Sequence, residues 1–187
     1  MSITAIIQKT YVLPDSALHK VERLAEHMLL PKGHLLLRAD KIEHQMYFIE
    51  KGIVRAYANP DDTDITFWFG KEQDIIISMK SYVDGAAGYE HIELLEDCSL
   101  YRIHTSSLQQ LFETDIHISN WGRKFAEQEL IKTEERLISR QFKTAKERYQ
   151  ELLHNHPDLL QRVQLGHIAS YLGITQVSLS RIRAEIK

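Results

Sequence analysis

The C-terminal part of the sequence carries polar side chains that could read the edges of DNA bases. Gln176 has an amide that can form two hydrogen bonds with adenine, and Arg181 has a guanidinium that can do the same with guanine. We expect Gln176, Ser178 and Arg181 to share an exposed helix face. The full set of candidate DNA-binding residues is Thr175, Gln176, Val177, Ser178, Arg181 and Lys187.

Two short helices are needed to hold these side chains, and the sequence predicts them. Residues 168–172 favour a helix that Gly173 ends, and Thr175 can cap a second helix that continues through Ile186. A helix, a glycine turn and a capped helix form the helix-turn-helix plan, whose second helix enters the major groove. Helical hairpins with glycine turns also occur in proteins that never bind DNA.

The charge of the chain is unevenly distributed. The formal net charge is −3, but residues 140–187 carry +4 and the preceding residues carry −7. A basic end on an acidic body favours contact of that end alone with a polyanion.

The remaining candidate chemistry is sparse, and the sequence does not indicate an enzyme. The single cysteine, Cys98, can neither pair internally nor hold zinc or an iron–sulfur cluster alone, and it fits a reducing cytoplasm. A cupin-like metal enzyme needs clustered histidines, but the ten here are scattered, and the His154-Asn155-His156 pair lies at a predicted helix end. We therefore expect no catalytic residue, metal or cofactor.

The elements before the C-terminal helices fall into three stretches. A helix is predicted from Pro14-Asp15-Ser16 up to Pro31, with Leu18, Val21, Leu24, Ala25 and Met28 on one face. Residues 34–103 alternate short apolar runs with turns, which is typical of a β-sandwich or β-roll, and 84–88 favour a flexible loop within it. Neither a spanning helix nor a signal peptide is indicated.

The stretch from Ile118 to about Leu153 predicts a long helix followed by another, because it contains no proline. An interrupted apolar stripe runs along it at Trp121, Phe125, Ile131, Ile138 and Phe142. A long helix with a narrow seam often pairs with a copy of itself, so we expect a homodimer. The alternative is that the stripe packs on the β domain of the same chain.

Three segments give the chain a resemblance to the Crp/Fnr superfamily of transcription regulators: 47–55 in the roll, Ala145-Lys146-Glu147-Arg148-Tyr149, and 168–183. The resemblance implies an α+β protein with a cyclic-nucleotide-binding-like β-roll sensor domain at 1–116, a dimerisation helix at 117–141 and a helix-turn-helix domain at 142–187. It also implies double-stranded DNA and RNA polymerase as partners, and no membrane.

The sensor region departs from the family pattern. Nucleotide-binding members hold the ribose and cyclic phosphate with a Gly-Glu pair and a downstream Arg-Ser/Thr pair, where this sequence has Ile77-Ser78 and Gly88-Tyr89. A cyclic phosphate needs a cation or several donors, so we expect no binding of cyclic AMP. The apolar residues nearby favour a small or apolar ligand, or a filled core. We also expect the β-hairpin wing of many members to be missing.

The second C-terminal helix departs as well, because Gln176-Val177 stand where many members carry Arg-Glu. Replacing an acceptor for cytosine with Val177 favours contact with a thymine methyl group. Arg181 remains at the place of the family's base-reading arginine, although it could instead pair with Glu185. A second hypothesis is a regulatory β-roll that binds a small unknown ligand and uses its terminal helices for protein contact.

Overall fold

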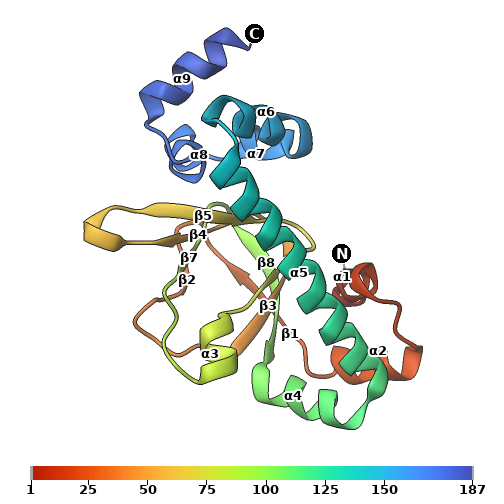
Figure 1. Ribbon diagram of the computed structural model, residues 1–187. Helices are drawn as coiled ribbons and strands as arrows, with labels where there is room; N and C mark the ends of the chain where they lie inside the picture. The colour runs from red at the N-terminus through yellow and green to blue at the C-terminus, as the bar shows by residue number, and fades with distance from the viewer. Residues whose placement is uncertain (1, 187) are drawn as a thin grey trace. The chain divides into compact units, whose positions relative to one another are not determined.

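The computed structural model describes residues 2–186, which form a mixed α+β structure (Figure 1). The described chain divides into two compact units. Unit 1 contains the chain up to Ala56 and Phe69–Glu129, and unit 2 contains Tyr57–Trp68 and the chain from Leu130 onward.

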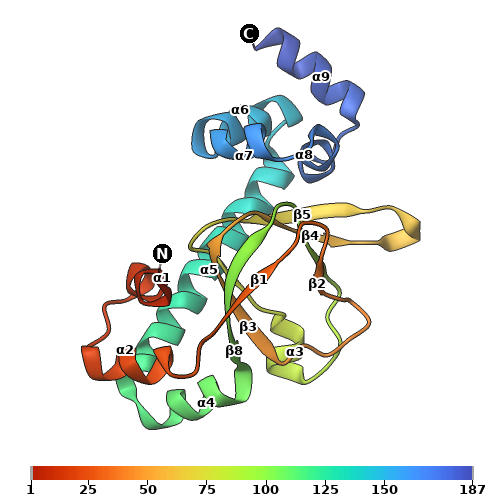
Figure 2. The same cartoon turned by 180° about the vertical axis from the view of Figure 1, so that it is seen from behind.

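The strands confirm the predicted β-roll. Within residues 2–186 they form two four-stranded sheets, ordered β1-β8-β3-β6 and β2-β7-β4-β5, and Figure 2 shows the first from behind. The strands are β1 (Glu26–Leu30), β2 (Leu35–Leu37), β3 (Gln45–Lys51), β4 (Val54–Ala58), β5 (Ile65–Gly70), β6 (Ile75–Ile76), β7 (His91–Leu94) and β8 (Cys98–His104).

Strand β3 is buried on both faces, which explains its unbroken apolar run. Four consecutive residues, Met46 to Ile49, are buried, and they pair antiparallel with β8. Met46 and Phe48 belong to the core that helices cover. These helices are α1 (Ile3–Thr10), α2 (Asp15–Glu22), α4 (Thr105–Thr114) and the first half of α5 (Ile116–Phe142).

The prediction of one helix from Pro14 to Pro31 is wrong beyond Glu22. Helix α2 starts at Asp15 as expected, but Glu26–Leu30 forms β1, which pairs with β8. The apolar residues 24, 25 and 28 fit a helical spacing over this short stretch, but pairing with an edge of the sheet satisfies the backbone of 26–30 instead. Asp84 was expected to begin a loop, and it is the last residue of α3 (Met79–Asp84).

The two halves of α5 have different surroundings. Trp121 is buried, and its indole N–H donates to the carbonyl of Ile7 at 3.2 Å, so the first half packs on the β domain as the alternative reading of the stripe required. In the second half, the apolar side chains are 52–76% exposed. They are Leu130, Ile131, Leu137, Ile138 and Phe142.

Unit 2 is mainly helical, as predicted for the C-terminal part. Its helices after α5 are α6 (Ala145–Asn155), α7 (Pro157–Arg162), α8 (Leu165–Leu172) and α9 (Gln176–Glu185). The hairpin between β4 and β5, with the short 3-10 helix η1 (Pro60–Asp62) at its tip, belongs to this unit. Ser170 of α8 fastens it, because its Oγ accepts from the Thr66 amide at 2.9 Å and donates to the Asp64 carbonyl at 3.0 Å.

Candidate functional site

The turn between α8 and α9 is built around Gly173, which adopts the left-handed conformation with φ 68°. Its amide donates to the carbonyl of Ser170 at 3.0 Å, and the amide of Ile174 donates to the carbonyl of Ala169 at 3.0 Å. These two bonds form a Schellman cap, in which a side chain at the left-handed position would be strained. The predicted glycine stop is confirmed, and it turns the chain sharply before α9.

Arg148 of α6 stabilises the same turn through a hydrogen bond to the last residue of α8. Its guanidinium donates from Nη2 to the carbonyl oxygen of Leu172 at 2.7 Å and from Nη1 to the carbonyl of Lys143. A cation at a helix C-terminus compensates the partial negative charge of the last carbonyl groups. The sequence identified the segment 145–149 only as a family resemblance, and the structure gives it this supporting role.

Helix α9 begins at Gln176, and Thr175 is its N-cap as predicted. The Thr175 hydroxyl oxygen accepts a hydrogen bond from the amide of Ser178 at 3.2 Å, which is the bond of an N-cap. Leu179 is fully buried, and α9 contacts α8, in which Ile168 and Leu172 are also buried. Ile182 is half-buried on the same side. The two helices therefore pack as a helix-turn-helix requires.

The exposed face of α9 differs in one residue from the expectation. At about 100° per residue, Gln176, Val177, Ser180 and Arg181 lie within an arc of about 140°, and all four are exposed. Ser178, which was expected on this face, is half-buried, and its amide is bonded to Thr175. The angle of 100° per residue could have placed Ser180 on this exposed face from the sequence alone. Lys187 lies outside the described residues.

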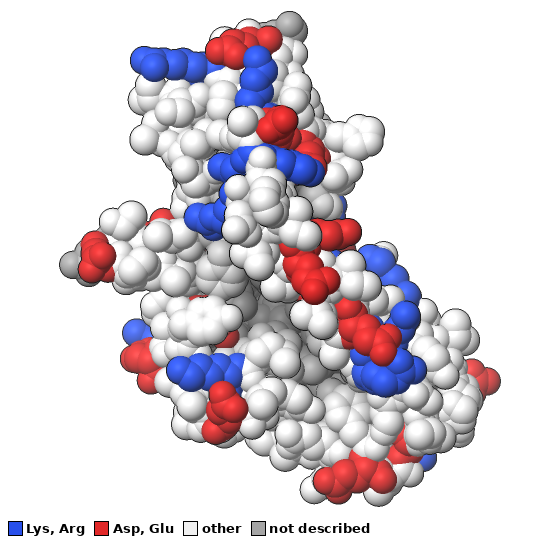
Figure 3. Space-filling model, in the orientation of Figure 1, with Lys and Arg blue, Asp and Glu red and all other residues white. Residues whose placement is uncertain are grey.

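The guanidinium of Arg181 is available to a partner molecule. Within residues 2–186 no hydrogen bond or ion pair joins it to another side chain. Glu185, the expected alternative partner, instead accepts from Lys146 at 2.8 Å, and this hydrogen bond lowers the pKa of Glu185. On the face that Figure 3 shows, Lys and Arg side chains near α9 have acidic side chains beside them.

Residues 77–90 of the β-roll, called the cassette below, contain a buried carboxylate, whereas a phosphate ligand would need a cation. Ser78 and Glu90 are buried, while Met79 and Tyr89 are exposed, so the apolar lining that the sequence suggested is only partly present. The buried cation Arg55 is joined to Glu93 at 2.9 Å. Glu90 is not among the residues predicted from the sequence, although its position two residues after Gly88 could have indicated it.

Two surface hollows lie away from the cassette. One, of about 390 Å³, is lined by Leu29, Pro31, Lys51 and neighbouring residues, and it borders Cys98. Burial raises the pKa of the Cys98 thiol to about 11, so this thiol is a poor nucleophile. The second, of about 490 Å³, lies along α6 and is lined by residues such as Lys143 and His154.

No group of three or more His, Cys, Asp or Glu side chains in residues 2–186 is arranged to hold a metal ion. None of the described helices combines the length and the apolar character needed to cross a bilayer.

Comparison with known proteins identifies the roll and the fold. Residues 28–115 match the family model of the cyclic nucleotide-binding domain. A comparison with curated protein sequences gave no match.

Several solved structures match the chain over most of its length. FixK2 from Bradyrhizobium japonicum has a TM-score of 0.74 at 21% identity, covering 87% of this chain and 84% of FixK2. A regulator assigned to the crp/fnr family from Eubacterium rectale has a TM-score of 0.73 at 14% identity, covering 91% and 82% of the two chains. The c-di-GMP responsive regulator CLP from Xanthomonas campestris has a TM-score of 0.68 at 16% identity, covering 92% and 91%.

Two of these three proteins are described as regulators, and at such identities the likeness concerns the fold. Residues 28–115 therefore resemble the cyclic nucleotide-binding domain, and the chain shares its fold with solved structures that include a regulator assigned to the crp/fnr family.

Proposed function

We propose that this protein is a dimeric, DNA-binding transcription regulator whose sensor roll does not bind cyclic AMP. Its proposed domain organisation is a sensor domain at 1–116, a dimerisation helix at 117–141 and a DNA-binding domain at 142–187. Activity as an enzyme is not part of this proposal. The cytoplasm stays the predicted location, on the argument from the single cysteine.

The observation that carries the proposal is the exposed face of α9. Leu179 is the buried residue of α9, Gly173 ends the preceding helix and Thr175 caps α9. Arg181 is exposed and has no partner among the described residues. A helix that served only as structure would gain nothing from an unpaired arginine there, whereas a base-reading helix requires one. Val177, which is 62% exposed, would contact a thymine methyl group.

Dimerisation is supported by the second half of α5. Leu130 and Leu137 are seven residues apart, and so are Ile131 and Ile138, so both pairs repeat with the heptad spacing of a coiled coil. Exposed apolar side chains on one stretch of helix mark an interaction surface. One helix-turn-helix with little positive charge binds weakly, and two copies one DNA turn apart, about 34 Å, bind usefully.

The argument against cyclic AMP is electrostatic. A cyclic phosphate gains most from charge-assisted hydrogen bonds, as an arginine would supply. The cassette has no arginine between residues 77 and 90, and its buried charged residue is Glu90. Bringing a phosphate to a buried carboxylate would add repulsion to the missing attraction.

The test is selection of binding sites from a randomised duplex DNA library with the purified full-length protein. We expect enrichment of a two-fold symmetric sequence with half-sites one helical turn apart. Measured affinities for the enriched and a scrambled duplex should then differ by about 10³-fold or more. Failure to enrich any sequence, together with equal weak binding of both duplexes, would favour the rival hypothesis that the terminal helices contact a protein.

A further inference from the structure

Two arginines near the end of α5, Arg136 and Arg140, have no acidic neighbour on the helix. Residues three and four positions apart are neighbours on a helix surface. For these two arginines, such neighbours are each other and Lys132, Thr133, Leu137, Ser139, Lys143 and Thr144. Arg136 donates to the Thr133 hydroxyl at 3.0 Å, and within residues 2–186 no hydrogen bond or ion pair joins Arg140 to another residue. The helix therefore ends with two like charges on one face.

Arg140 lies beside the turn that precedes α9. A Cβ atom on Gly173 would be 3.6 Å from Arg140 Nη2 and 4.0 Å from Arg148 Nη2, so two guanidinium groups adjoin this turn. Burial raises the pKa of the Tyr171 hydroxyl in α8, and the charges of Arg136 and Arg140 oppose that rise, which places both arginines near α8. All of these residues belong to unit 2. The end of α5 therefore brings positive charge to the helix-turn-helix.

A purely structural role for Arg140 would be to compensate the carbonyl groups at the end of α8. A cation is favourable there, because helix C-termini carry partial negative charge. Arg148 already fills this role, since its Nη2 donates to the carbonyl of Leu172 at 2.7 Å. Arg140 makes no such bond within the described residues, and its side chain is exposed. Its N–H donors are therefore available to a ligand.

The two arginines point away from the apolar surface of α5 on which the proposed dimer depends. At about 100° per residue, Arg136 and Arg140 lie about 40° apart and about 140° from the middle of the exposed apolar stripe. That stripe consists of Leu130, Ile131, Leu137 and Ile138. A substitution at Arg140 therefore leaves the stripe intact, and its effect on a ligand can be measured apart from dimerisation.

The ligand that fits these charges is an anion with several acceptor oxygens. Like charges four residues apart destabilise a helix, and a bound anion would compensate them. A guanidinium forms strong, geometrically matched hydrogen bonds with phosphate oxygens. The proposed function brings duplex DNA to the same turn, because α9 is the helix that would enter the major groove and phosphates flank that groove.

We propose that Arg140, assisted by Arg136, is a phosphate-binding site that holds the DNA backbone beside the turn between α8 and α9. The inference rests on the proposed function, since its ligand is the duplex that α9 reads. Contacts to phosphate carry no base information, so this site adds affinity for every sequence equally. The long helix then has a second task, because its end contacts DNA in each copy of the dimer.

The experiment measures how DNA affinity depends on salt, by fluorescence anisotropy with the purified full-length protein and with the enriched and scrambled duplexes. We expect Arg140→Ala to reduce the slope of log affinity against log salt concentration by about 0.9 per half-site. At about 0.1 M salt this loss weakens binding of both duplexes about fivefold to tenfold per half-site. Arg140→Lys keeps the charge and should keep the slope. Arg38→Ala, at an exposed arginine of unit 1, should change neither affinity nor slope.

Light scattering and chemical denaturation of Arg140→Ala complete the experiment, and we expect the mass of a dimer and an unchanged free energy of unfolding. If the wild type binds DNA and Arg140→Ala keeps its slope, this proposal alone is overturned. A loss of stability with an unchanged slope would assign Arg140 to the end of α8. Weaker binding of the enriched duplex alone would show base reading and would also overturn the proposal. Absence of DNA binding by the wild type would overturn both this site and the proposed function.

Discussion

Lys146 of α6 and Glu185 of α9 form an ion pair with 2.8 Å between Nζ and Oε2. The pair joins positions 39 residues apart and ties the last turn of α9 to the segment that also supplies Arg148. It occupies the carboxylate that could have neutralised Arg181. Among the described residues, Arg181 is therefore left without an acidic partner.

Replacement of this arginine should affect DNA recognition and leave folding unchanged. We expect Arg181→Ala to cost about 1–3 kcal/mol of discrimination per half-site, most strongly at one guanine, because a bidentate contact is lost. Thermal unfolding should be unaltered, since the side chain is exposed. The measurement is fluorescence anisotropy with the selected duplex and with a scrambled one.

Two control variants separate base reading from general attraction. Arg38→Ala removes an exposed arginine of unit 1 outside the proposed dimerisation helix and should change neither affinity. Lys187→Ala should lower both affinities equally and reduce the salt slope by about 0.9 per half-site, because we assign Lys187 to phosphate contact. An unchanged specificity ratio in Arg181→Ala would refute the assignment of this face.

Dimerisation should depend on the exposed half of α5. We expect Leu137→Glu to convert the dimer to a monomer at micromolar concentration, since it places charge in the proposed seam. Light scattering coupled to gel filtration gives the mass directly. Leu153→Glu, at another exposed apolar residue, should remain dimeric. A wild-type monomer at this concentration would contradict the prediction outright.

Cyclic AMP should give no binding signal in calorimetry. Each charge-assisted hydrogen bond missing from the cassette is worth about 1.5–3 kcal/mol, so losing two or three moves a micromolar affinity beyond millimolar. Micromolar binding would show that the roll holds the phosphate through groups other than those of the cassette.

Two glycines of unit 2 should respond to alanine in opposite directions. Gly173→Ala should lower the free energy of unfolding by about 1–2 kcal/mol, because a Cβ at φ 68° is strained. Gly166→Ala should raise it by about 0.5–1 kcal/mol, since Gly166 lies within α8 and its added Cβ would come no closer than 3.5 Å to another group. Chemical denaturation of both variants tests the pair, and changes of equal sign would be inconsistent with this geometry.

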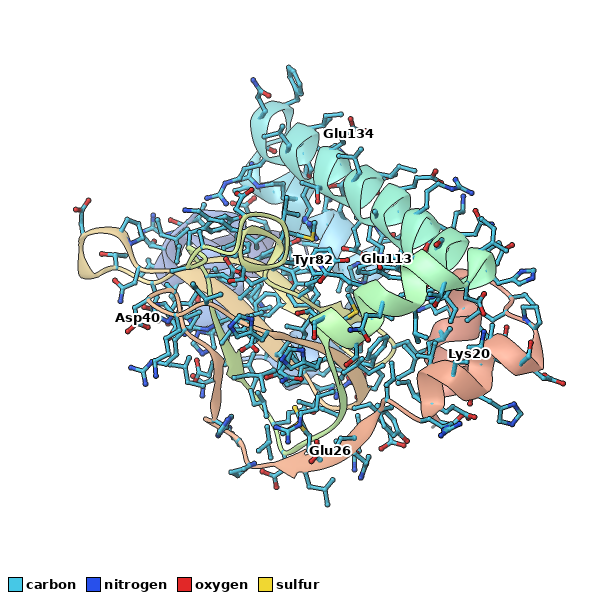
Figure 4. The ribbon with its side chains drawn as sticks, turned by 90° about the horizontal axis from the view of Figure 1, so that it is seen from below. Lys20, Glu26, Asp40, Tyr82, Glu113 and Glu134 are labelled. Carbon is cyan, nitrogen blue, oxygen red and sulfur yellow. The ribbon has the colours of Figure 1, made fainter. Side chains whose placement is uncertain are left out.

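Stability at low pH should depend on Asp115 (Figure 4 labels its partner, Lys20). The hydrogen bond from Lys20 at 2.7 Å, together with the amides of Ile118 and His117, lowers the pKa of Asp115 in the folded state. A lowered folded pKa contributes stability above the unfolded pKa of about 3.9 and loses it as the pH falls.

The wild-type protein should therefore lose more stability than Asp115→Asn when the pH is lowered from about 6 to about 3. Asparagine caps a helix as well as aspartate does, so this comparison isolates the charge. Denaturation at each pH provides the measurement, and Glu113→Gln is the control. Parallel curves for wild type and Asp115→Asn would mean that the Lys20–Asp115 ion pair does not contribute to the free energy of unfolding in solution.

The sequence was most informative where local chemistry determines structure. Gly173 and Thr175 mark the turn and the cap by residue type alone, and both are found there. The alternating pattern also identified the roll. The strand at 26–30 was missed because its partner, β8, lies about 70 residues away in the sequence, and no local pattern encodes that pairing.

Parts of the candidate sites depend on contacts between distant residues in the same way. The support of Leu172 by Arg148 and the approach of Arg140 to Gly173 require the folded chain, since neither pair has a characteristic spacing. Ser178 was misplaced for a different reason, because its position on the helix was not weighed against the buried side that Leu179 defines.

The path of the chain has a practical consequence. The polypeptide leaves unit 1 after Ala56, returns at Phe69 and leaves again after Glu129, so three covalent links join the units. A fragment starting at Leu130 would lose the hairpin and expose the Ser170 hydroxyl that it engages. Neither unit could therefore be excised at a single cut or exchanged by simple fusion.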